Sequence, residues 1–324
     1  MAMRRILCYN VAGKAGETQL AQKDITEKAL VWYNDVFSDI VNNLLFDGKD
    51  VVSPDALQNA VTHLPYKSDS RKVRAQDRDS CKLWIDQKTE IRLSYFGIEN
   101  ETEAEDDMSF RVIGYDGAAY RDQIYDYTGE NKNRVKNKER YPVVTLVLYM
   151  GYKKHWDKAK TLYEGFTRPV PELLKPYVWN YGINLFEIAY LTDEQVNCFH
   201  SDFWIVADYF TQMRKNNNYV PSERQLIHVR EVLDLMRVLT GDERFTEHVD
   251  EFEKSKEAVT MCAVLDEVEN RGFRNGEQRG EQNAKNQMIL NMVKDGLEPE
   301  KIAKYAEVTT EYVFKIKDGE LQMV

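Results

Sequence analysis

The chain has 324 residues, of which 43% are hydrophobic and 11% aromatic, and these are values of a folded globular protein. Its formal net charge of −10 excludes a surface that is basic throughout, so nucleic acid could be bound only through locally basic segments. No apolar run is long enough to span a bilayer, and the first 22 residues lack the apolar region of a secretory signal. We therefore expect a cytoplasmic protein with no membrane partner.

The cysteines and histidines carry no metal-binding pattern. The four cysteines, at positions 8, 81, 198 and 262, form no CxxC pair, and the five histidines lack the spacing of metal ligands. We expect neither a disulfide framework nor a zinc site, and interpret these residues as core or surface residues.

The first half of the chain begins, after a weakly ordered lead-in at residues 1–22, with a long helix over 24–45. Apolar residues recur there at helical spacing, Asp24 can cap its start, and Asp47-Gly48 can end it. A second helix is expected over 108–127, with an apolar side made of Phe110, Ile113, Tyr120 and Ile124.

Strand-like stretches stand between and after these helices. Their residues are rich in β-branched and aromatic side chains, and they cover 78–85, 91–100, 141–151 and 181–189. The run at 141–151 is continuously apolar, which is typical of a buried central strand. The order helix, strands, helix, strand predicts an α/β domain with a mixed sheet over residues 23–190.

Two short stretches, 66–74 and 130–140, are locally basic within this acidic chain. They are either solvated loops or the places where the protein contacts nucleic-acid phosphates.

The second half is predicted to be helical. Helices are expected at 192–215, 222–240 and 246–270, which together form a helical region over 191–270. In the following segment, 271–285, Gly272, Gly276 and Gly280 recur every four residues and would share one stripe of a helix. The stripe either packs on another copy of the chain, which makes a homo-oligomer, or the segment is a flexible hinge.

Residues 286–324 form a small helical tail with two short helices around a turn. Thr309 can cap the second helix, and the candidate core residues are Ile302, Tyr305, Val308 and Val313. The outline resembles a helix-turn-helix, but the second helix has only Lys315 and Lys317 as cations. This favours an appendage that packs or binds a partner over one that reads a DNA groove.

The candidate site comes from strand pairing. If residues 86–90 form the turn between the first two strands, Asp79 lies opposite or nearly opposite Glu99. Directly paired side chains are ~5 Å apart, and two carboxylates that close need a cation or a shared proton. A hard divalent metal such as magnesium satisfies both carboxylates through oxygen ligands.

Alternation along the strand adds Glu101 to the face that carries Glu99. Gly97 is on the same face and leaves room beside the site. Without further support, the opposed acids could equally be solvated and without function.

A resemblance supports the metal site. The chain resembles the recombination-promoting nuclease/putative transposase family, which has a PD-(D/E)XK core and typically reads RDxxK, GIENQ and MPxRxxxYD. The matching runs are Arg78-Asp79-Ser80-Cys81-Lys82, Gly97-Ile98-Glu99-Asn100-Glu101, Met108-Ser109-Phe110-Arg111 and Tyr115-Asp116. The resemblance covers most of residues 22–285 and implies a restriction-endonuclease-like fold.

The resemblance also implies a chemistry. Asp79 and Glu99 would bind Mg²⁺ or Mn²⁺ and promote water attack on a DNA phosphodiester, and Glu101 would be an auxiliary ligand. Asp39 on the first helix is a further, weaker acid candidate.

One departure from the superfamily pattern concerns its lysine, whose place is taken here by Glu101. Arg111 could supply the missing cation, and Lys82 could do so only through a bulge in its strand. The expected function is a magnesium-dependent DNA endonuclease associated with recombination or mobile DNA. The alternative is a catalytically inactive member that acts as a DNA- or protein-binding regulatory subunit.

Overall fold

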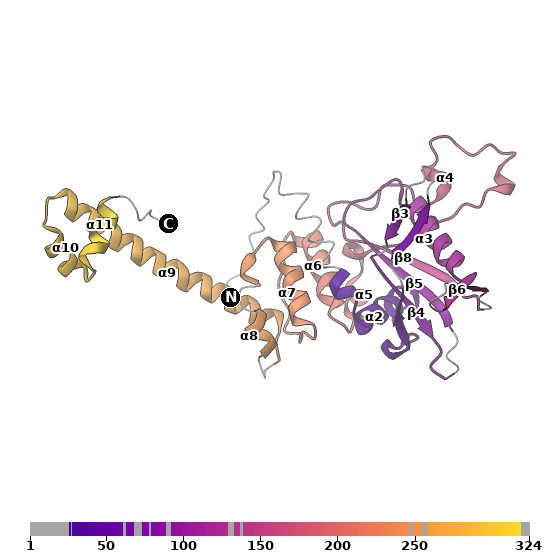
Figure 1. The fold of residues 1–324 in the computed structure, drawn as a ribbon, viewed down its shortest axis with the longest axis horizontal. Helices are drawn as coiled ribbons and strands as arrows, with labels where there is room; N and C mark the ends of the chain where they lie inside the picture. The colour runs from indigo at the N-terminus through magenta and orange to yellow at the C-terminus, as the bar shows by residue number, and fades with distance from the viewer. Residues whose placement is uncertain are drawn as a thin grey trace. The chain divides into compact units, whose positions relative to one another are not determined.

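The computed structural model describes residues 26, 28–60, 63–67, 73–77, 79–88, 92–128, 133–136, 139–245, 249–254 and 258–318. The predicted lead-in and Asp24 lie outside these residues. The described residues form two compact units, one from 1–220 with 225–259 and one from 221–224 with 260–324 (Figure 1). None of the helices in the described ranges combines the length and the apolar character that crossing a membrane requires.

A five-stranded mixed sheet is the centre of the first unit, as the sequence predicts. Its strands, in spatial order, are β1 (Leu57–Asn59), β4 (Ser80–Ile85), β5 (Arg92–Glu101), β8 (Val143–Tyr149) and β9 (Asn184–Glu187). The strands β1, β4 and β5 pair antiparallel, whereas β5, β8 and β9 pair parallel. The predicted strands correspond to β4, β5, β8 and β9, and β1 was not predicted.

The two faces of the sheet are covered by different helices. α2 (Asn34–Leu45) lies on the face that carries Lys82, because the Phe37 ring is next to the Lys82 ammonium. α3 (Met108–Asp122) lies on the other face, where Ala119 packs with Cys81, Tyr95 and Val143. Figure 1 shows both helices beside the sheet.

Both helices correct details of the sequence prediction. The single helix expected over 24–45 is interrupted at Trp32 and Tyr33, although its end at Asp47 and Gly48 is confirmed by their positive φ angles. The apolar side expected for the second helix is wrong, since its four predicted residues are at least partly exposed. The buried side instead includes Met108, Val112, Tyr115 and Ala119, and the polar residue Asp116 is buried with them because it is hydrogen-bonded.

Two β-hairpins occupy the regions of the basic stretches. They are formed by β2 (His63–Lys67) with β3 (Val73–Asp77), and by β6 (Tyr125–Thr128) with β7 (Asn133–Lys136). The tips of both hairpins lie outside the described residues, so the predicted phosphate contacts remain a prediction.

The remaining elements of the first unit are short or helical. They are η1 (Pro54–Ala56), α4 (Leu162–Gly165), η2 (Lys175–Tyr177), η3 (Ile188–Tyr190), α5 (Asp193–Asn197), α6 (Phe203–Asn216), α7 (Val229–Thr240), η4 (Glu243–Phe245) and α8 (Val249–Lys254). Asp39 on α2 joins this helical part to the sheet. Its carboxylate accepts hydrogen bonds from the backbone amides of His200 and Ser201, at 2.9 and 2.8 Å, and from the Ser201 hydroxyl at 2.6 Å.

The second unit consists of a long helix and a compact pair of helices. α9 (Met261–Lys294) runs without a break through the glycine repeat, so the segment is helical and not a hinge. α10 (Pro299–Ala306) and α11 (Thr310–Lys317) follow, and Thr309 caps α11 as predicted. Ile302 and Val313 are buried with Ile289, whereas Tyr305 is exposed and not part of this core.

Candidate active site

The paired carboxylates lie where β4 begins and β5 ends, at the end of the hairpin away from its turn. Ser80 pairs with Ile98, and continuing this antiparallel register by one residue places Asp79 opposite Glu99. The backbone N–H of Asn100 donates to Oδ2 of Asp79 at 2.8 Å, which holds the aspartate next to β5. Glu99 is fully buried, with 0% of its surface exposed. The register of β4 and β5 thus agrees with the predicted placement of the two acids opposite each other.

A lysine that the sequence reasoning missed contacts the aspartate. The Lys28 ammonium lies 2.9 Å from Oδ1 of Asp79. Lys28 belongs to the short helical stretch before α2, and nothing in its sequence context distinguishes it from a solvated helix residue. Only the folding of the N-terminal helical stretch against the start of β4 creates this pair.

Arg111 links the remaining carboxylates. It lies in the first turn of α3, and its Nη1 donates to Oε1 of Glu101 at 2.7 Å and to Oε2 of Glu105 at 2.9 Å. Its Nη2 lies 3.4 Å from Oε2 of Glu99. A planar guanidinium can contact several carboxylates at once because its donors point in different directions. The predicted cation Arg111 is thus brought to the site, and Glu105 was not anticipated.

Burial changes the protonation of this cluster. Desolvation raises the pKa of Glu101 to about 7, with Glu105 and Asp79 acting in the same direction and Arg111 against it. Burial also raises the pKa of Tyr115, and the negative charge of Glu99 adds to this effect. The Glu101 carboxyl can therefore exchange a proton near neutral pH, as candidate acid–base groups do.

Tyr115 and Asp116 have separate contacts on α3. Tyr115 is hydrogen-bonded to Arg111. Asp116 is buried and accepts hydrogen bonds from the Thr145 hydroxyl, at 2.5 Å, and from the Tyr181 hydroxyl. These bonds fix α3 over β8 and keep Arg111 at the carboxylates.

Lys82 is not brought to the carboxylates, which corrects the expectation that it could replace the motif lysine. The strand alternates regularly from Ser80 to Trp84, and the register shift occurs later, between Trp84 and Ile85. Lys82 is consequently buried on the opposite face, where its ammonium donates to the Trp32 carbonyl at 2.7 Å and to Asn59 Oδ1 at 2.6 Å. Burial lowers its pKa to about 8.

Asp39 is not part of the site either. Its Oδ2 accepts the hydrogen bonds from His200 and Ser201, and its Oδ1 accepts one from the Asn43 amide at 2.8 Å. These contacts give it a structural role just before the start of α6.

The donor chemistry of the pair fits a hard divalent cation. Asp79 and Glu99 present carboxylate oxygens on one face, and such oxygens are the ligands that magnesium prefers. Across the described ranges, however, no three side chains of Asp, Glu, His or Cys gather closely enough to hold a metal ion. Glu101 is turned to Arg111 and does not complete a ligand set with the other two. The structure thus supports a two-carboxylate site more directly than a three-carboxylate one.

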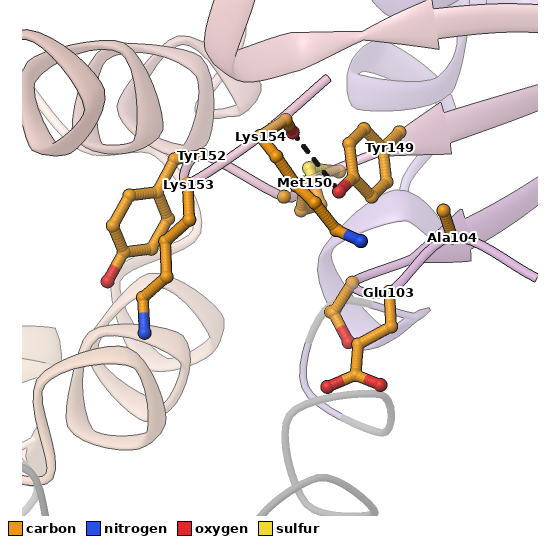
Figure 2. A pocket seen from close by; sticks show the side chains of 9 residues that line it. Glu103, Ala104, Tyr149, Met150, Tyr152, Lys153 and Lys154 are labelled. Atoms are coloured by element: carbon orange, nitrogen blue, oxygen red, sulfur yellow. Dashed lines mark hydrogen bonds between the residues drawn. The ribbon is translucent and has the colours of Figure 1, made fainter. Parts of the chain in front are cut away.

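A pocket of about 420 Å³ opens directly after Glu101. It lies at the carboxyl ends of the parallel strands β5 and β8, where α/β sheets commonly bind ligands, and Thr102, Glu103, Tyr149 and Lys153 line it. In Figure 2, Tyr152 and Lys153 line one side, and Glu103 and Ala104 line the other. In the described part of the chain Lys153 makes no ion pair, whereas Lys154 pairs with Asp157 at 2.8 Å.

Fold and site together define an α/β protein whose mixed sheet carries a buried acidic pair, countered by a lysine and an arginine, beside an open pocket. Residues 85–238 match the family described as putative transposase, YhgA-like. The match confirms the resemblance seen in the sequence; it includes Glu99, Glu101 and Arg111 and begins after Asp79. No curated protein and no solved structure matches the chain.

Proposed function

We propose that the protein is a metal-dependent DNA endonuclease that acts on mobile or recombining DNA. The observation that carries the proposal is the placement of Asp79 beside the fully buried Glu99, with Arg111 at the same carboxylates. Two adjacent acids in a protein interior are costly unless a cation accompanies them. The match of residues 85–238 to a family of putative transposases supports DNA as the substrate.

The roles of the residues follow from their chemistry. Asp79 and Glu99 would hold Mg²⁺ or Mn²⁺, which, when bound, activates water and stabilises negative charge on the phosphate. Arg111 would turn part of its guanidinium to the non-bridging phosphate oxygens, since arginine binds phosphates through two parallel hydrogen bonds. Glu101, whose pKa is raised to about 7, would accept or return a proton at the reacting group.

Lys28 is the best placed residue for the work of the absent motif lysine. Its ammonium contacts Asp79 at 2.9 Å, and its side chain is partly exposed, so it can also reach solvent. We propose that it orients the attacking water or a phosphate oxygen. The pocket beside Glu101 would receive the adjoining nucleotide, and Lys153 is the cation available there for its phosphate.

Cleavage of supercoiled plasmid with Mg²⁺ or Mn²⁺ tests the proposal. Wild type should nick the plasmid, chelation should stop it, and Asp79→Ala and Glu99→Gln should each lower the rate at least 100-fold. Asp106→Asn is a matched control, because Asp106 is an exposed acid that pairs with Lys158. Cleavage that survives Asp79→Ala would remove the site assignment.

The alternative, a catalytically inactive subunit, is favoured by one observation. Glu101 occupies the position of the superfamily lysine, and Arg111 contacts Glu101, Glu99 and Glu105, so its charge is already used within the protein. In that case the plasmid stays intact while the protein still binds DNA or a protein partner. Calorimetric titration with Mg²⁺ also distinguishes the endonuclease from the inactive subunit. An inactive subunit in which Arg111 stays paired with the carboxylates should bind the ion weakly or not at all.

We also propose that the chain self-associates through the glycine stripe of α9. The support is the four-residue spacing, together with open space of at least 4 Å where a side chain on Gly276 or Gly280 would extend. Gly276→Leu should lower the sedimentation coefficient of an oligomer to that of a monomer. An unchanged coefficient would exclude the stripe as an interface.

A further inference from the structure

Residues 166–182 form an arm between α4 and β9 that carries large apolar side chains into solvent. Leu173, Tyr177 and Trp179 are 87%, 82% and 90% exposed, and Leu174 is also exposed. Figure 1 shows the segment after α4 as a loop that extends away from the sheet. Single exposed apolar residues are common on proteins, but several on one short segment indicate a binding surface.

The arm is ordered by its own contacts. The Tyr163 hydroxyl donates to the Val178 carbonyl at 2.6 Å, and the Tyr163 backbone N–H donates to Asn180 Oδ1 at 2.9 Å. Backbone bonds close its base, including Leu162 N–H to the Tyr181 carbonyl at 2.9 Å. Its sequence contains Pro169, Pro171 and Pro176, which restrict the backbone further. The exposed aromatic rings are therefore held out in advance of binding, which lowers the entropy cost of a contact.

The base of the arm is attached to the helix that carries Arg111. The Phe166 ring packs edge-on against Phe110, with 5.7 Å between ring centres. The Tyr181 hydroxyl donates to Asp116. Phe110 directly precedes Arg111, and Asp116 directly follows Tyr115. The base of the arm is therefore attached at two points to the helix that contributes Arg111 to the site.

The charge of the arm favours a nucleic acid over a protein or a second copy of this chain. The arm contains Arg168, Lys175 and a single acid, Glu172, in a chain with a net charge of −10. Glu172 is engaged by Lys175, whereas Arg168 is exposed and makes no ion pair within the described residues. A segment with a net charge of +1, one arginine unpaired in the described part of the chain, and exposed aromatic rings can contact a phosphate and stack on bases.

We propose that Trp179 of the arm, supported by Tyr177, stacks on bases of the DNA that is bound at the carboxylate site. The preferred substrate then has an unstacked or unpaired base step next to the arm. The inference rests on the proposed function and specifies its substrate: duplex DNA that is mismatched, nicked or locally open is bound more tightly than a fully paired duplex. Apolar and aromatic wedges in other DNA-binding proteins open base steps in this way.

The test uses the full chain in EDTA, so that binding is measured without cleavage. Fluorescence anisotropy is recorded with a paired duplex and with the same duplex carrying a central mismatch beside 2-aminopurine. Wild type should prefer the mismatched duplex and quench 2-aminopurine on stacking. Trp179→Ala should weaken binding of the mismatched duplex roughly 10-fold, the order expected for one stacked base, and abolish the quenching.

Two further variants separate base stacking from general apolar contact. Trp179→Phe retains a flat ring and should keep most of the preference, whereas Trp179→Leu retains apolar surface only and should behave like Trp179→Ala. Because Trp179 is 90% exposed, thermal unfolding should be the same in all variants. Unchanged DNA affinity in Trp179→Ala, failure of wild type to bind DNA, or a change in sedimentation instead of DNA binding would overturn the inference.

The outcome is independent of catalysis. If the protein cleaves DNA in a metal-dependent way and Trp179→Ala leaves DNA binding unchanged, the proposal for the arm is wrong and the proposed function stands. Stacking by Trp179 without any cleavage would support the arm and remove the endonuclease.

Discussion

Arg111 donates to Glu101 at 2.7 Å across the mouth of the acidic site, from the first turn of α3 to the last residue of β5. Glu101 stands at the position of the superfamily lysine, and Arg111 brings a cation to it. The contact joins a permanent cation to a carboxyl group whose pKa is raised to about 7. The charge of this pair therefore changes within the physiological pH range.

Glu101 should make the stability of the protein depend on pH. Because its pKa is raised in the folded state from 4.5 to about 7, the folded protein keeps a proton that the unfolded chain releases. The free energy of unfolding should then fall as the pH rises from 4.5 to 7, by about 2–3 kcal/mol in total. Urea unfolding at pH 4.5 and pH 8 should show this loss in wild type and in the exposed control Asp106→Asn, but not in Glu101→Gln. Parallel pH profiles of wild type and Glu101→Gln would contradict it.

Removing Arg111 should destabilise the fold and create a demand for a divalent cation. Arg111→Ala leaves Glu99 and Glu101 buried without the guanidinium, which should cost about 2–4 kcal/mol. Mg²⁺ should raise the melting temperature of this variant more than that of wild type, since the ion replaces the missing charge. The double variant Glu99→Gln/Arg111→Ala should lose this extra response. An equal response of all three proteins would show that the ion binds elsewhere.

Lys82 should act on stability and not on cleavage. Lys82→Met leaves the Trp32 carbonyl and Asn59 Oδ1 without their donor, so we expect a loss of about 2–4 kcal/mol. Cleavage per folded molecule, measured well below the melting temperature, should stay within about twofold of wild type. Lys88→Met, at an exposed position of the neighbouring turn, is the control for the loss of charge. A well-folded but inactive Lys82→Met protein would restore Lys82 to the catalytic candidates.

Gly151 should be intolerant of a side chain, in contrast to a helical glycine. A Cβ at Gly151 would lie 2.1 Å from the ring of Tyr149, which packs edge-on against Trp156. Gly151→Ala should therefore displace this ring and cost about 1–3 kcal/mol. Gly117→Ala, at an exposed position of α3 where nothing lies within 4 Å, should stabilise the helix by about 0.5–1 kcal/mol. Denaturant unfolding of both variants measures the two effects, and a gain in stability for Gly151→Ala would contradict the predicted clash.

Tyr163 should control the order of the arm without controlling the fold. Tyr163→Phe removes the hydroxyl that donates to the Val178 carbonyl, so the arm should open more often while the melting temperature stays within a few degrees. Chymotrypsin should then cleave at Leu173, Tyr177 or Trp179 several-fold faster than in wild type, as followed by mass spectrometry. Equal cleavage rates would mean that the other contacts at the base are sufficient to hold the arm.

The sequence predicted those parts of the fold that depend on strong local patterns. The hairpin register that pairs Asp79 with Glu99 follows from alternation and turn length, and the run before Gly151 is recognisable as a buried strand. The buried side of α3 was not predictable in this way, because Ser109 and Asp116 face the interior while Phe110 is partly exposed against Phe166. Tertiary contacts decided the orientation of this helix, against the pattern of its apolar residues.

The site residues also differ in whether the local sequence or only the folded protein reveals them. Arg111 could be anticipated from its place after Glu101, whereas Lys28 reaches Asp79 from 51 residues earlier in the chain, as only the folded protein can show. For Lys82 the sequence was sufficient, because strict alternation along the strand already placed it on the face opposite Asp79. A bulge between Asp79 and Lys82 would have turned it to the site, but the register shift occurs later, between Trp84 and Ile85.

Asp39 has a consequence for how this chain can be divided. Its carboxylate accepts hydrogen bonds from the backbone amides of His200 and Ser201. The first helix of the sheet domain is therefore bonded to residues of the helical region more than 160 positions later in the chain. A chain shortened after residue 190 would lose these donors and expose the side of α2 that the helical region covers. The two regions should therefore be inherited, expressed and lost together, as a single evolutionary module.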